Sequence, residues 1–488
     1  MKNKELGIMN NDRYPFFIIL SSSFILNSMF ALQRYREHVT LFLIALLPFH
    51  AFLVTVGTKW MEGPNHAPAG MLVLWKETLL GTILLMVLVE LAKRLAISGQ
   101  RLAFFTMDWI DGCIIALLVL AVIVSSFELR VTSFVYGFKY DFIPLIMFLI
   151  LRRVEWTQEF RDLAIKIITI VGGIIAAYGI ISFFLPGSFF TWLGYSDLHS
   201  LYIPNGPLAA FQHLESLGIR RIQSVMSGPN QLGLWLLLPF SVGCVMWVKK
   251  PTFGWTLFIL LTGFAIDLTF SRAAWIAASV IMIVLLIRYR YYKLLGGFIT
   301  IGILAVIMTL IFLPSILLRA TSNREHFARP VVALQTMIAH PFGLGLGSAG
   351  PATNRTSDAC VHLSQGDDAS WAKDHPNLCV YIDDEQVQPA DRTCICPFLP
   401  ENWYIQMGVE LGWLGFTLYL LLIGLITRTS YLATSKFRSI FGQLTFMSFL
   451  GISIAALFLH AWEDSAIAYT VWILLAALLP SKKEEDFR

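Results

Sequence analysis

Two segments carry arginines that could bind an anion. Arg220 and Arg221 lie shortly before a helix that is predicted to begin at Pro229, because proline is favoured at the first helical position, and Asn230 lies in its first turn. Arg272 lies in a very short connection between two apolar segments. A guanidinium forms paired hydrogen bonds with a diphosphate or a carboxylate, so these side chains indicate an anion-binding site.

Side chains that could accept a proton occur at two other points of the chain. Glu401 and Asn402 precede an apolar segment, and Glu410 follows within that segment. His460 and Glu463 lie between the last two apolar segments. Partial burial raises the pKa of a carboxylate toward the range of a general base, and Glu401 is the first candidate for that role.

These groups also have structural interpretations. The first two arginines can be ordinary residues of a membrane interface, and Arg272 can pair with Asp267 one helical turn earlier. Glu401 can be a helix-start carboxylate that the macrodipole favours, and Asp464 or Ser465 can cap the last helix. An arginine held between two apolar segments is costly unless it is paired or faces a polar cavity, which favours a functional Arg272.

A glycine-rich segment runs from Pro341 to Gly350. Glycines at this spacing let backbone amides approach an oxyanion closely. No strand precedes the segment, so it is not a dinucleotide-binding motif. His340 lies just before this segment. After Glu401, His340 and His460 are the further candidates for the general base.

The elements that must position these residues are membrane helices. Of the 488 residues, 56% are hydrophobic and only 14% are charged, and the mean hydropathy is +0.67. This composition excludes a soluble globular enzyme, in which roughly a quarter of the residues are charged. The net charge of +4 gives no indication of a nucleic-acid partner. The predicted fold class is an all-α integral membrane protein.

Hydropathy predicts about twelve transmembrane helices, since the apolar blocks are about 20 residues long. The predicted spans are residues 39–57, 71–92, 108–127, 140–151, 164–185, 229–248, 252–270, 273–288, 295–313, 409–427, 441–460 and 466–480. Residues 140–151 are too few to cross unless the preceding 134–140 join them. A run at 16–32 is either a thirteenth span or a helix lying in the membrane plane.

The basic residues predict which side of the membrane each connection occupies. When the spans alternate, seven basic clusters hold 20 of the 36 Lys and Arg on one side, which is therefore cytoplasmic. The C-terminus is then cytoplasmic and the long loop extracytoplasmic. The predicted organisation is a transmembrane bundle (1–318) with an outer loop at 186–228, a large extracytoplasmic loop (319–408), and C-terminal transmembrane helices with a cytoplasmic tail (409–488).

Four of the six cysteines, Cys360, Cys379, Cys394 and Cys396, lie in the long loop. Disulfides persist outside the cytoplasm. Three connectivities are available, and a Cys394–Cys396 bridge is disfavoured because partners two residues apart rarely meet disulfide geometry. A Cys-x-Cys metal site is the alternative.

Together these features resemble the O-antigen ligase and O-antigen polymerase superfamily of polytopic glycosyltransferases, over most of the chain from about residue 40. The resemblance rests on Arg272 in its short outer turn, Arg220/Arg221 before Asn230, the glycine-rich segment, and Glu401-Asn402 leading into Gln406 and Glu410. It implies a GT-C-like fold in the bacterial cytoplasmic (inner) membrane. It further implies inverting, metal-independent transfer without a cofactor, from an undecaprenyl-diphosphate-linked glycan to a glycan, lipid or protein acceptor.

The resemblance also implies roles for residues. Arg272 matches the family's arginine after the short helix–helix turn, and Arg220 or Arg221 matches that of the first outer loop. These arginines would stabilise the departing diphosphate. Glu401 stands where the ligases have histidine, which is a departure from the family, and would take the acceptor's proton. The residues assigned to substrate binding are Asn230, His340, Asn402, Glu410, His460 and Glu463.

Two other functions fit the composition. A transporter or flippase for a lipid-linked or anionic glycan would also use membrane-embedded arginines and acids. It should carry polar residues near the bilayer midplane, whereas the only ones evident in the spans are Glu90 and Lys76/Glu77, nearer the ends. A non-catalytic subunit of a glycan-export complex is the third reading, which the loss of the family's histidine favours.

Overall fold

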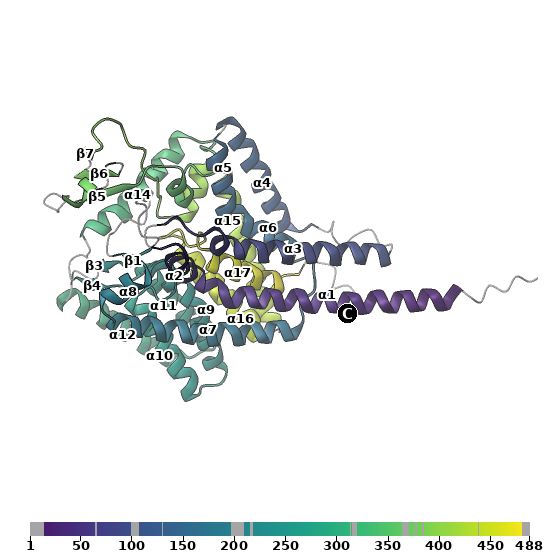
Figure 1. Ribbon diagram of the computed structural model, residues 1–488. Helices are drawn as coiled ribbons and strands as arrows, with labels where there is room; N and C mark the ends of the chain where they lie inside the picture. The colour runs from purple at the N-terminus through teal and green to yellow at the C-terminus, as the bar shows by residue number, and fades with distance from the viewer. Residues whose placement is uncertain are drawn as a thin grey trace, which may run out of the picture.

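The computed structural model describes residues 14–63, 66–98, 107–128, 130–196, 209–214, 218–312, 314, 320–363, 370–374, 376, 378–382, 385–437 and 439–480. It is a bundle of α-helices with three small sheets (Figure 1). Within these residues, eight helical segments are long and apolar enough to cross a membrane. Only a helix or a closed barrel satisfies backbone polar groups in lipid. The predicted class, a helical membrane protein, is confirmed.

The N-terminal part of the bundle is almost continuous helix. In order it contains α1 (Tyr14–Leu46), the 3₁₀ turn η1 (Leu47–Phe49), α2 (His50–Glu62), α3 (Gly70–Ser98), α4 (Trp109–Glu128), α5 (Val131–Gly137), the π-helical turn η3 (Phe138–Phe142), α6 (Ile143–Leu151) and α7 (Gln158–Phe184). Residues Val131–Leu151 form one helical segment of 21 residues. The residues before 140 therefore complete this span, as expected.

The described residues of the predicted outer loop at 186–228 contain α8 (Gly187–Leu193) and two small sheets. Strand β1 (Tyr195–Ser196) pairs in parallel with β2 (Ala209–Ala210), and β3 (His213–Leu214) pairs antiparallel with β4 (Ile219–Arg220). Helices α9 (Pro229–Lys249), α10 (Phe253–Leu268), α11 (Arg272–Arg288) and α12 (Tyr292–Phe312) follow. Helix α9 begins at Pro229, as predicted.

The C-terminal part contains α14 (Ala320–Ala339), η4 (Gly350–Arg355), β5 (Cys360–Leu363), η5 (Ser370–Asp374), β6 (Cys379–Ile382), β7 (Glu385–Gln388), α15 (Trp403–Phe437), α16 (Ile440–Ala455) and α17 (Ser465–Leu478). Four predicted spans appear as the shorter helices α10, α11, α16 and α17, of 14 to 17 residues. Seventeen residues rise about 26 Å, less than a typical hydrocarbon core. Turns at 269–271 and 456–464 take the place of the missing helical residues.

Helix α1 decides how the N-terminal run is built. The helix is continuous from Tyr14 to Leu46 and extends beyond the rest of the bundle (Figure 1). Residues 16–32 are therefore the first half of the helix that leads into the first predicted span, and no turn separates the two. This continuity contradicts a separate, antiparallel thirteenth span.

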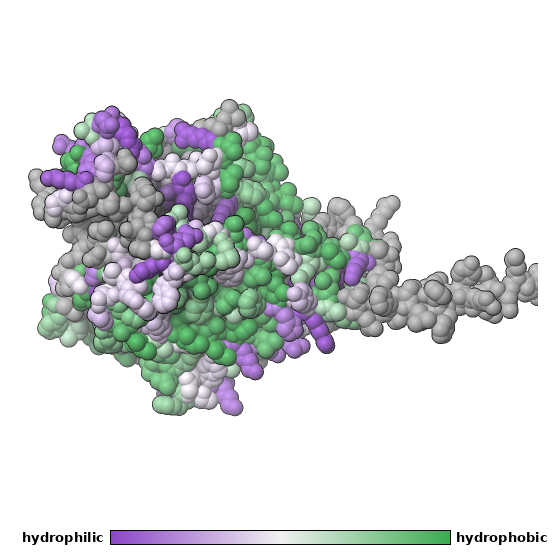
Figure 2. All heavy atoms as spheres, viewed as in Figure 1, coloured by the Kyte–Doolittle hydropathy of each residue, from purple (hydrophilic) through white to green (hydrophobic). Residues whose placement is uncertain are grey.

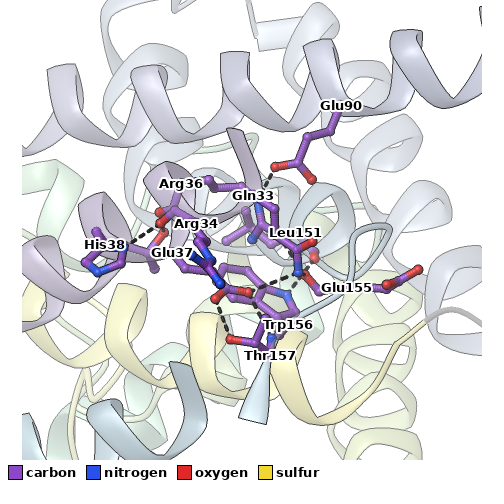
Figure 3. A network of polar contacts seen from close by, with 11 residues as sticks. Gln33, Arg34, Arg36, Glu37, His38, Glu90, Leu151, Glu155, Trp156 and Thr157 are labelled. Carbon is purple, nitrogen blue, oxygen red and sulfur yellow. Dashed lines mark hydrogen bonds and ion pairs between the residues drawn. The ribbon is translucent and has the colours of Figure 1, made fainter. Parts of the chain in front are cut away.

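One end of the bundle gathers basic side chains that the charge pattern assigned to a single side. Arg36 on α1 binds Glu90 of α3 (Nε to Oε1 2.8 Å) and the Glu155 carbonyl in the turn before α7, and its guanidinium lies over Trp156 (Figure 3). Arg152 donates to the Leu479 carbonyl at the end of α17. Helix ends that the alternation of spans assigns to one side, those around Arg36 and Arg152, thus lie together at one end of the bundle.

The core of the bundle is built around α9. Most of its residues are buried, and it packs against α7, α10, α11 and α16. By contrast, no residue of α12 is buried, although the helix is strongly apolar. On the face that Figure 2 shows, hydrophobic residues cover much of the bundle, whereas hydrophilic residues gather over β5–β7 at the upper left. Such an exposed apolar surface fits a lipid environment.

The predicted large loop has structure of its own. It begins with helix α14, whose Phe327, Val331 and Ile338 side chains are exposed. Its distal part is a three-stranded sheet in which β6 pairs in parallel with β5 and antiparallel with β7. Disulfides Cys360–Cys396 and Cys379–Cys394 brace this sheet, with Cα–Cα distances of 5.6 and 6.1 Å. Loop disulfides are confirmed, and the disfavoured Cys394–Cys396 bridge is absent from this sheet.

The metal alternative for the Cys-x-Cys pair is contradicted. Asp358 does lie beside Cys379 and Cys394. Cys394 is bonded to Cys379, however, and Cys396 is bonded to Cys360. None of these sulfurs is therefore available as a thiolate ligand.

Removing one bridge should loosen the sheet and leave the bundle intact. The Cys379–Cys394 bridge closes a segment of 15 residues, for which the chain-entropy relation gives about 3 kcal/mol. We expect the Cys379→Ser/Cys394→Ser variant to be cleaved within residues 357–396 by a protease that spares the wild type. The Cys113→Ser/Cys244→Ser variant, which replaces the two free cysteines of the chain, is the matched control. It should be cleaved no faster than the wild type. Equal resistance of all three proteins would contradict the bracing role.

Candidate functional site

The structure joins Arg221 to the turn that holds Arg272. Arg221 Nε donates to the Thr269 carbonyl at 2.9 Å, and the Ile222 amide donates to the Leu268 carbonyl. Arg221 Nη2 also donates to Asn230 Oδ1 at 2.8 Å. Arg272, the first residue of α11, is half-buried three residues after the carbonyl that Arg221 binds. The two arginines and Asn230 therefore belong to one cluster around the start of α9, the end of α10 and the start of α11.

Arg220 points elsewhere. Its Nη2 donates to the carbonyls of Ser182 and Leu185 at the C-terminal end of α7, and its guanidinium lies 4.2 Å from the Phe190 ring centroid. A cation at the negative end of a helix dipole is a stabilising arrangement. Of the two neighbouring arginines, Arg221 is the one in the cluster with Arg272.

Glu401 and His460 meet at the N-terminal end of α15. The Glu401 amide donates to His460 Nε2 (3.2 Å), so Nε2 is unprotonated and Nδ1–H donates to Gln406 Oε1 (2.8 Å). The Glu401 carboxylate pairs with Arg329 on α14 at 3.0 Å. Because its lone pair is already used, His460 is the weaker of the two candidate bases in this structure.

The backbone around Glu401 is held in an uncommon conformation. Its φ is +54°, a region that costs a non-glycine residue energy. The next two residues fix this turn to the end of α16: Asn402 Nδ2 donates to the Leu457 carbonyl, and the Trp403 amide donates to the Ala456 carbonyl. Asn402 Oδ1 also accepts the Ile405 amide at the start of α15. Asn402 thus orients the strained turn that presents Glu401.

The turn before α17 connects the two clusters. Asp464 caps α17 by accepting the Ala466 amide at 2.8 Å, as the capping interpretation predicted. The same carboxylate accepts from Ser227 Oγ at 3.2 Å, three residues before Asn230. His460 and Glu463 lie in this turn as well. These hydrogen bonds, and the short stretches of chain between them, form a polar layer that runs from Arg272 and Arg221 through Asp464 to Glu401.

Burial makes Glu463 the acid in this turn that titrates near neutral pH. Desolvation, with the charges of Asp464 and Glu401, raises the pKa of Glu463 from 4.5 to about 8. The folded state then binds more protons than the unfolded state between pH 4.5 and 8, so stability falls as pH rises through this window. One proton corresponds to a slope of about 1.4 kcal/mol per pH unit.

Replacing Glu463 should flatten this pH dependence. We expect Glu463→Gln to melt at a temperature less sensitive to pH than the wild type, most clearly in the middle of this window, near about pH 6. Thermal unfolding in detergent over a series of pH values measures the effect, and Glu385→Gln on the exposed strand β7 is the matched control. If the melting temperatures of the wild type and Glu463→Gln change equally with pH, the raised pKa of Glu463 is contradicted.

The amides of the glycine-rich segment do bind an oxygen atom, and it belongs to the Glu410 carboxyl group. The Gly347 and Ala349 amides donate to Glu410 Oε1 at 2.9 and 3.4 Å. Gly347 has a φ of +76°, and a Cβ there would collide with the Ser133 carbonyl. Glu410 is fully buried. In this structure the amides predicted to receive a ligand hold a side chain of the protein.

His340 stands apart from these clusters. It follows the last residue of α14, and its side chain is exposed. Its carbonyl accepts the Gly343 amide in the first turn of the glycine-rich segment. Among the residues that the structure describes, none joins this imidazole to the polar layer.

The structure adds two acids to this region: Asp141, which sequence reasoning missed, and Glu77, which it noted only as lying near the end of a span. Asp141 is 4% exposed in η3, and its Oδ1 accepts from Gln406 at 3.4 Å. Glu77 pairs with Lys76 and, at 3.1 Å, with Lys139. The view that the spans lack buried acids away from their ends is therefore wrong. Asp141 is the second residue of the predicted apolar segment 140–151, so hydropathy alone does not single it out.

Comparison with known proteins adds no family. No protein-family model matches the chain, and no curated protein is significantly similar to it. The chemistry has to be argued from the site. On one side of the turn that holds Asp464, the site offers the guanidinium groups of Arg221 and Arg272 for an anion. On the other side of that turn it offers the Glu401 carboxylate for a proton.

Proposed function

We propose that the protein is a membrane glycosyltransferase that transfers or polymerises a glycan from an undecaprenyl-diphosphate-linked donor on the extracytoplasmic face. The observation that carries this proposal is the polar layer that these hydrogen bonds and the short stretches of chain between them build from Arg272 and Arg221 to Glu401. It supplies positive charge and a proton acceptor in one layer, which substitution at a sugar diphosphate requires.

The proposed reaction is a single displacement. The acceptor hydroxyl oxygen attacks the anomeric carbon while the bond from that carbon to the diphosphate oxygen breaks, so the configuration inverts. The hydroxyl proton passes to the Glu401 carboxylate, and the bonding electrons leave with the lipid diphosphate. Arg272 and Arg221 stabilise the charge that develops on the leaving group.

The ion pair with Arg329 gives Glu401 a defined position before substrate binds. Arg329 comes from α14, the helix that opens the large outer region, and pairs with Glu401 at 3.0 Å. In this proposal Arg329 positions the base, Asn402 holds its turn, and Arg220 holds the outer end of α7.

The same proposal includes the finer topology. Twelve spans with a GT-C-like arrangement place the end that carries Arg36 and Arg152 in the cytoplasm of a bacterial inner membrane, and the disulfide-braced sheet outside. The gathering of basic residues at one end supports this orientation. The two disulfides support an oxidising compartment for the other end.

The test is reconstitution with a defined donor. The protein is placed in liposomes with an undecaprenyl-diphosphate oligosaccharide as the only substrate, and lipid-linked products are separated by gel. A ladder of longer glycans that Arg272→Ala abolishes identifies a polymerase. Transfer only after a foreign glycan, lipid or protein acceptor is added identifies a ligase. Absence of transfer under both conditions would contradict the proposed activity.

One observation favours a second candidate function. Asp141 and Glu410 are buried acids within helices long enough to span a membrane, where ionisable residues commonly belong to transport pathways. A transporter for a lipid-linked or anionic glycan is therefore the alternative. The two functions give different products, because a transporter would move the donor across the bilayer with its glycosidic bond intact.

A further inference from the structure

Two carboxyl groups are buried against each other inside the bundle. Asp141 on η3 is 4% exposed, and Glu410 on α15 is 0% exposed. The two side chains lie within hydrogen-bonding reach of one another. Two ionised carboxylates within hydrogen-bonding reach of each other, and away from water, would repel strongly.

The hydrogen bonds account for only half of the carboxyl oxygens. Glu410 Oε1 accepts the Gly347 and Ala349 amides, and Asp141 Oδ1 accepts the Gln406 amide. The other two oxygens, Asp141 Oδ2 and Glu410 Oε2, are buried without a donor among the residues that the structure describes. A buried acceptor without a donor is costly. A proton on one carboxyl would donate to the other and satisfy both oxygens.

The groups that face the pair supply no positive charge in the described part of the chain. The glycine-rich segment contributes backbone amides, and α15 contributes Gln406 and Tyr419. The turn before α17 contributes Glu463 and the neutral His460. These neighbours favour removing one negative charge from the pair and leave a proton as the simplest way to do so.

The backbone departs from regular α-helix on both sides of the pair. Asp141 lies in the π-helical turn η3, and α15 breaks at Gly412, two residues after Glu410, where φ is +69°. The glycine-rich segment docks beside this break, since the Leu344 and Gly345 amides donate to the Val409 and Glu410 carbonyls. Such departures inside helices frequently mark functional sites.

We propose that Asp141 and Glu410 form a proton-binding site, in which a single proton is shared between the two carboxyls. The amides of Gly347, Ala349 and Gln406 stabilise the one negative charge that remains. The site does not depend on the proposed glycosyltransferase activity. It does order the outer cluster, because Gln406 donates to Asp141 and so turns its carbonyl toward His460 Nδ1.

Infrared spectroscopy of the purified protein tests this site directly. The measurement is made above pH 8, where the Glu463 carboxyl, whose pKa is about 8, is largely ionised. We expect the wild type to show the carbonyl stretch of a protonated carboxyl, with a downward shift in heavy water. We expect Asp141→Asn and Glu410→Gln each to abolish it, because the new amide donates to the remaining carboxylate in the proton's place. Glu463→Gln is the matched control and should retain the band.

Three outcomes would overturn the proposal. The first is a wild type without this band, and the second is a band that survives both single variants. The third is a band that appears only when sodium is removed, which would assign the pair to a cation. If one variant fails to fold, the other variant and the heavy-water shift of the wild type still decide.

Discussion

Arg272→Lys should lose at least about a hundredfold in the rate of glycosyl transfer while the protein remains folded. The expected loss follows from the chemistry of the leaving group, because an ammonium cannot reproduce the paired hydrogen bonds of a guanidinium with a diphosphate. Removing one preorganised donor from a developing anion typically costs about 10²–10³ in rate. Product formation by the reconstituted protein, at saturating donor, is the measurement.

The same helix offers a matched control. Arg288 is the last residue of α11, at the opposite end of the helix, and its guanidinium lies 5.4 Å from the Tyr431 ring centroid. We expect Arg288→Lys to keep transfer within a few-fold of wild type. Equal rates for Arg272→Lys and the wild type would remove Arg272 from the proposed mechanism.

Glu401→Gln should also lose about a hundredfold or more in transfer rate, with its melting temperature little changed. Glutamine retains an oxygen for Arg329 and the backbone amide for His460, so the turn is preserved. What disappears is the capacity to accept a proton, which typically contributes about 10²–10⁴ in rate.

Two variants separate this role from structural support. Glu385→Gln on β7 makes the same chemical change at an exposed position outside the polar layer and should leave transfer unchanged. Arg329→Gln removes the positioning partner and should reduce transfer less than Glu401→Gln does. Full activity of Glu401→Gln would assign proton acceptance to another group.

Much of the fold was predictable from local sequence. Apolar blocks of about 20 residues locate the long helices, and Pro229 locates the start of α9. The shared cluster of Arg221 and Arg272 is a consequence of local chain geometry, since both arginines lie in the connections that flank α9 and α10. The charge pattern likewise anticipated which helix ends meet around Arg36 and Arg152.

The contacts that complete the site depend on long-range packing, which local patterns do not contain. Glu410 and its amide donor Gly347 are 63 positions apart, and Gln406 and Asp141 are 265 apart. Arg220 and Arg221 are adjacent in sequence, yet one binds the end of α7 and the other binds the turn before α11. The pairing of Cys360 with Cys396 likewise depends on how the sheet β5–β7 folds back.

The most direct test of the proposed activity is to follow the donor lipid itself. Proteoliposomes receive an undecaprenyl-diphosphate glycan and an acceptor, and free undecaprenyl diphosphate is quantified alongside the transmembrane position of intact donor. Glycosyl transfer predicts one released lipid diphosphate per bond formed, unchanged by a metal chelator and lost in Arg272→Ala. Donor that crosses the bilayer with its glycan still attached, without release of lipid diphosphate, would contradict the transferase and identify a transporter.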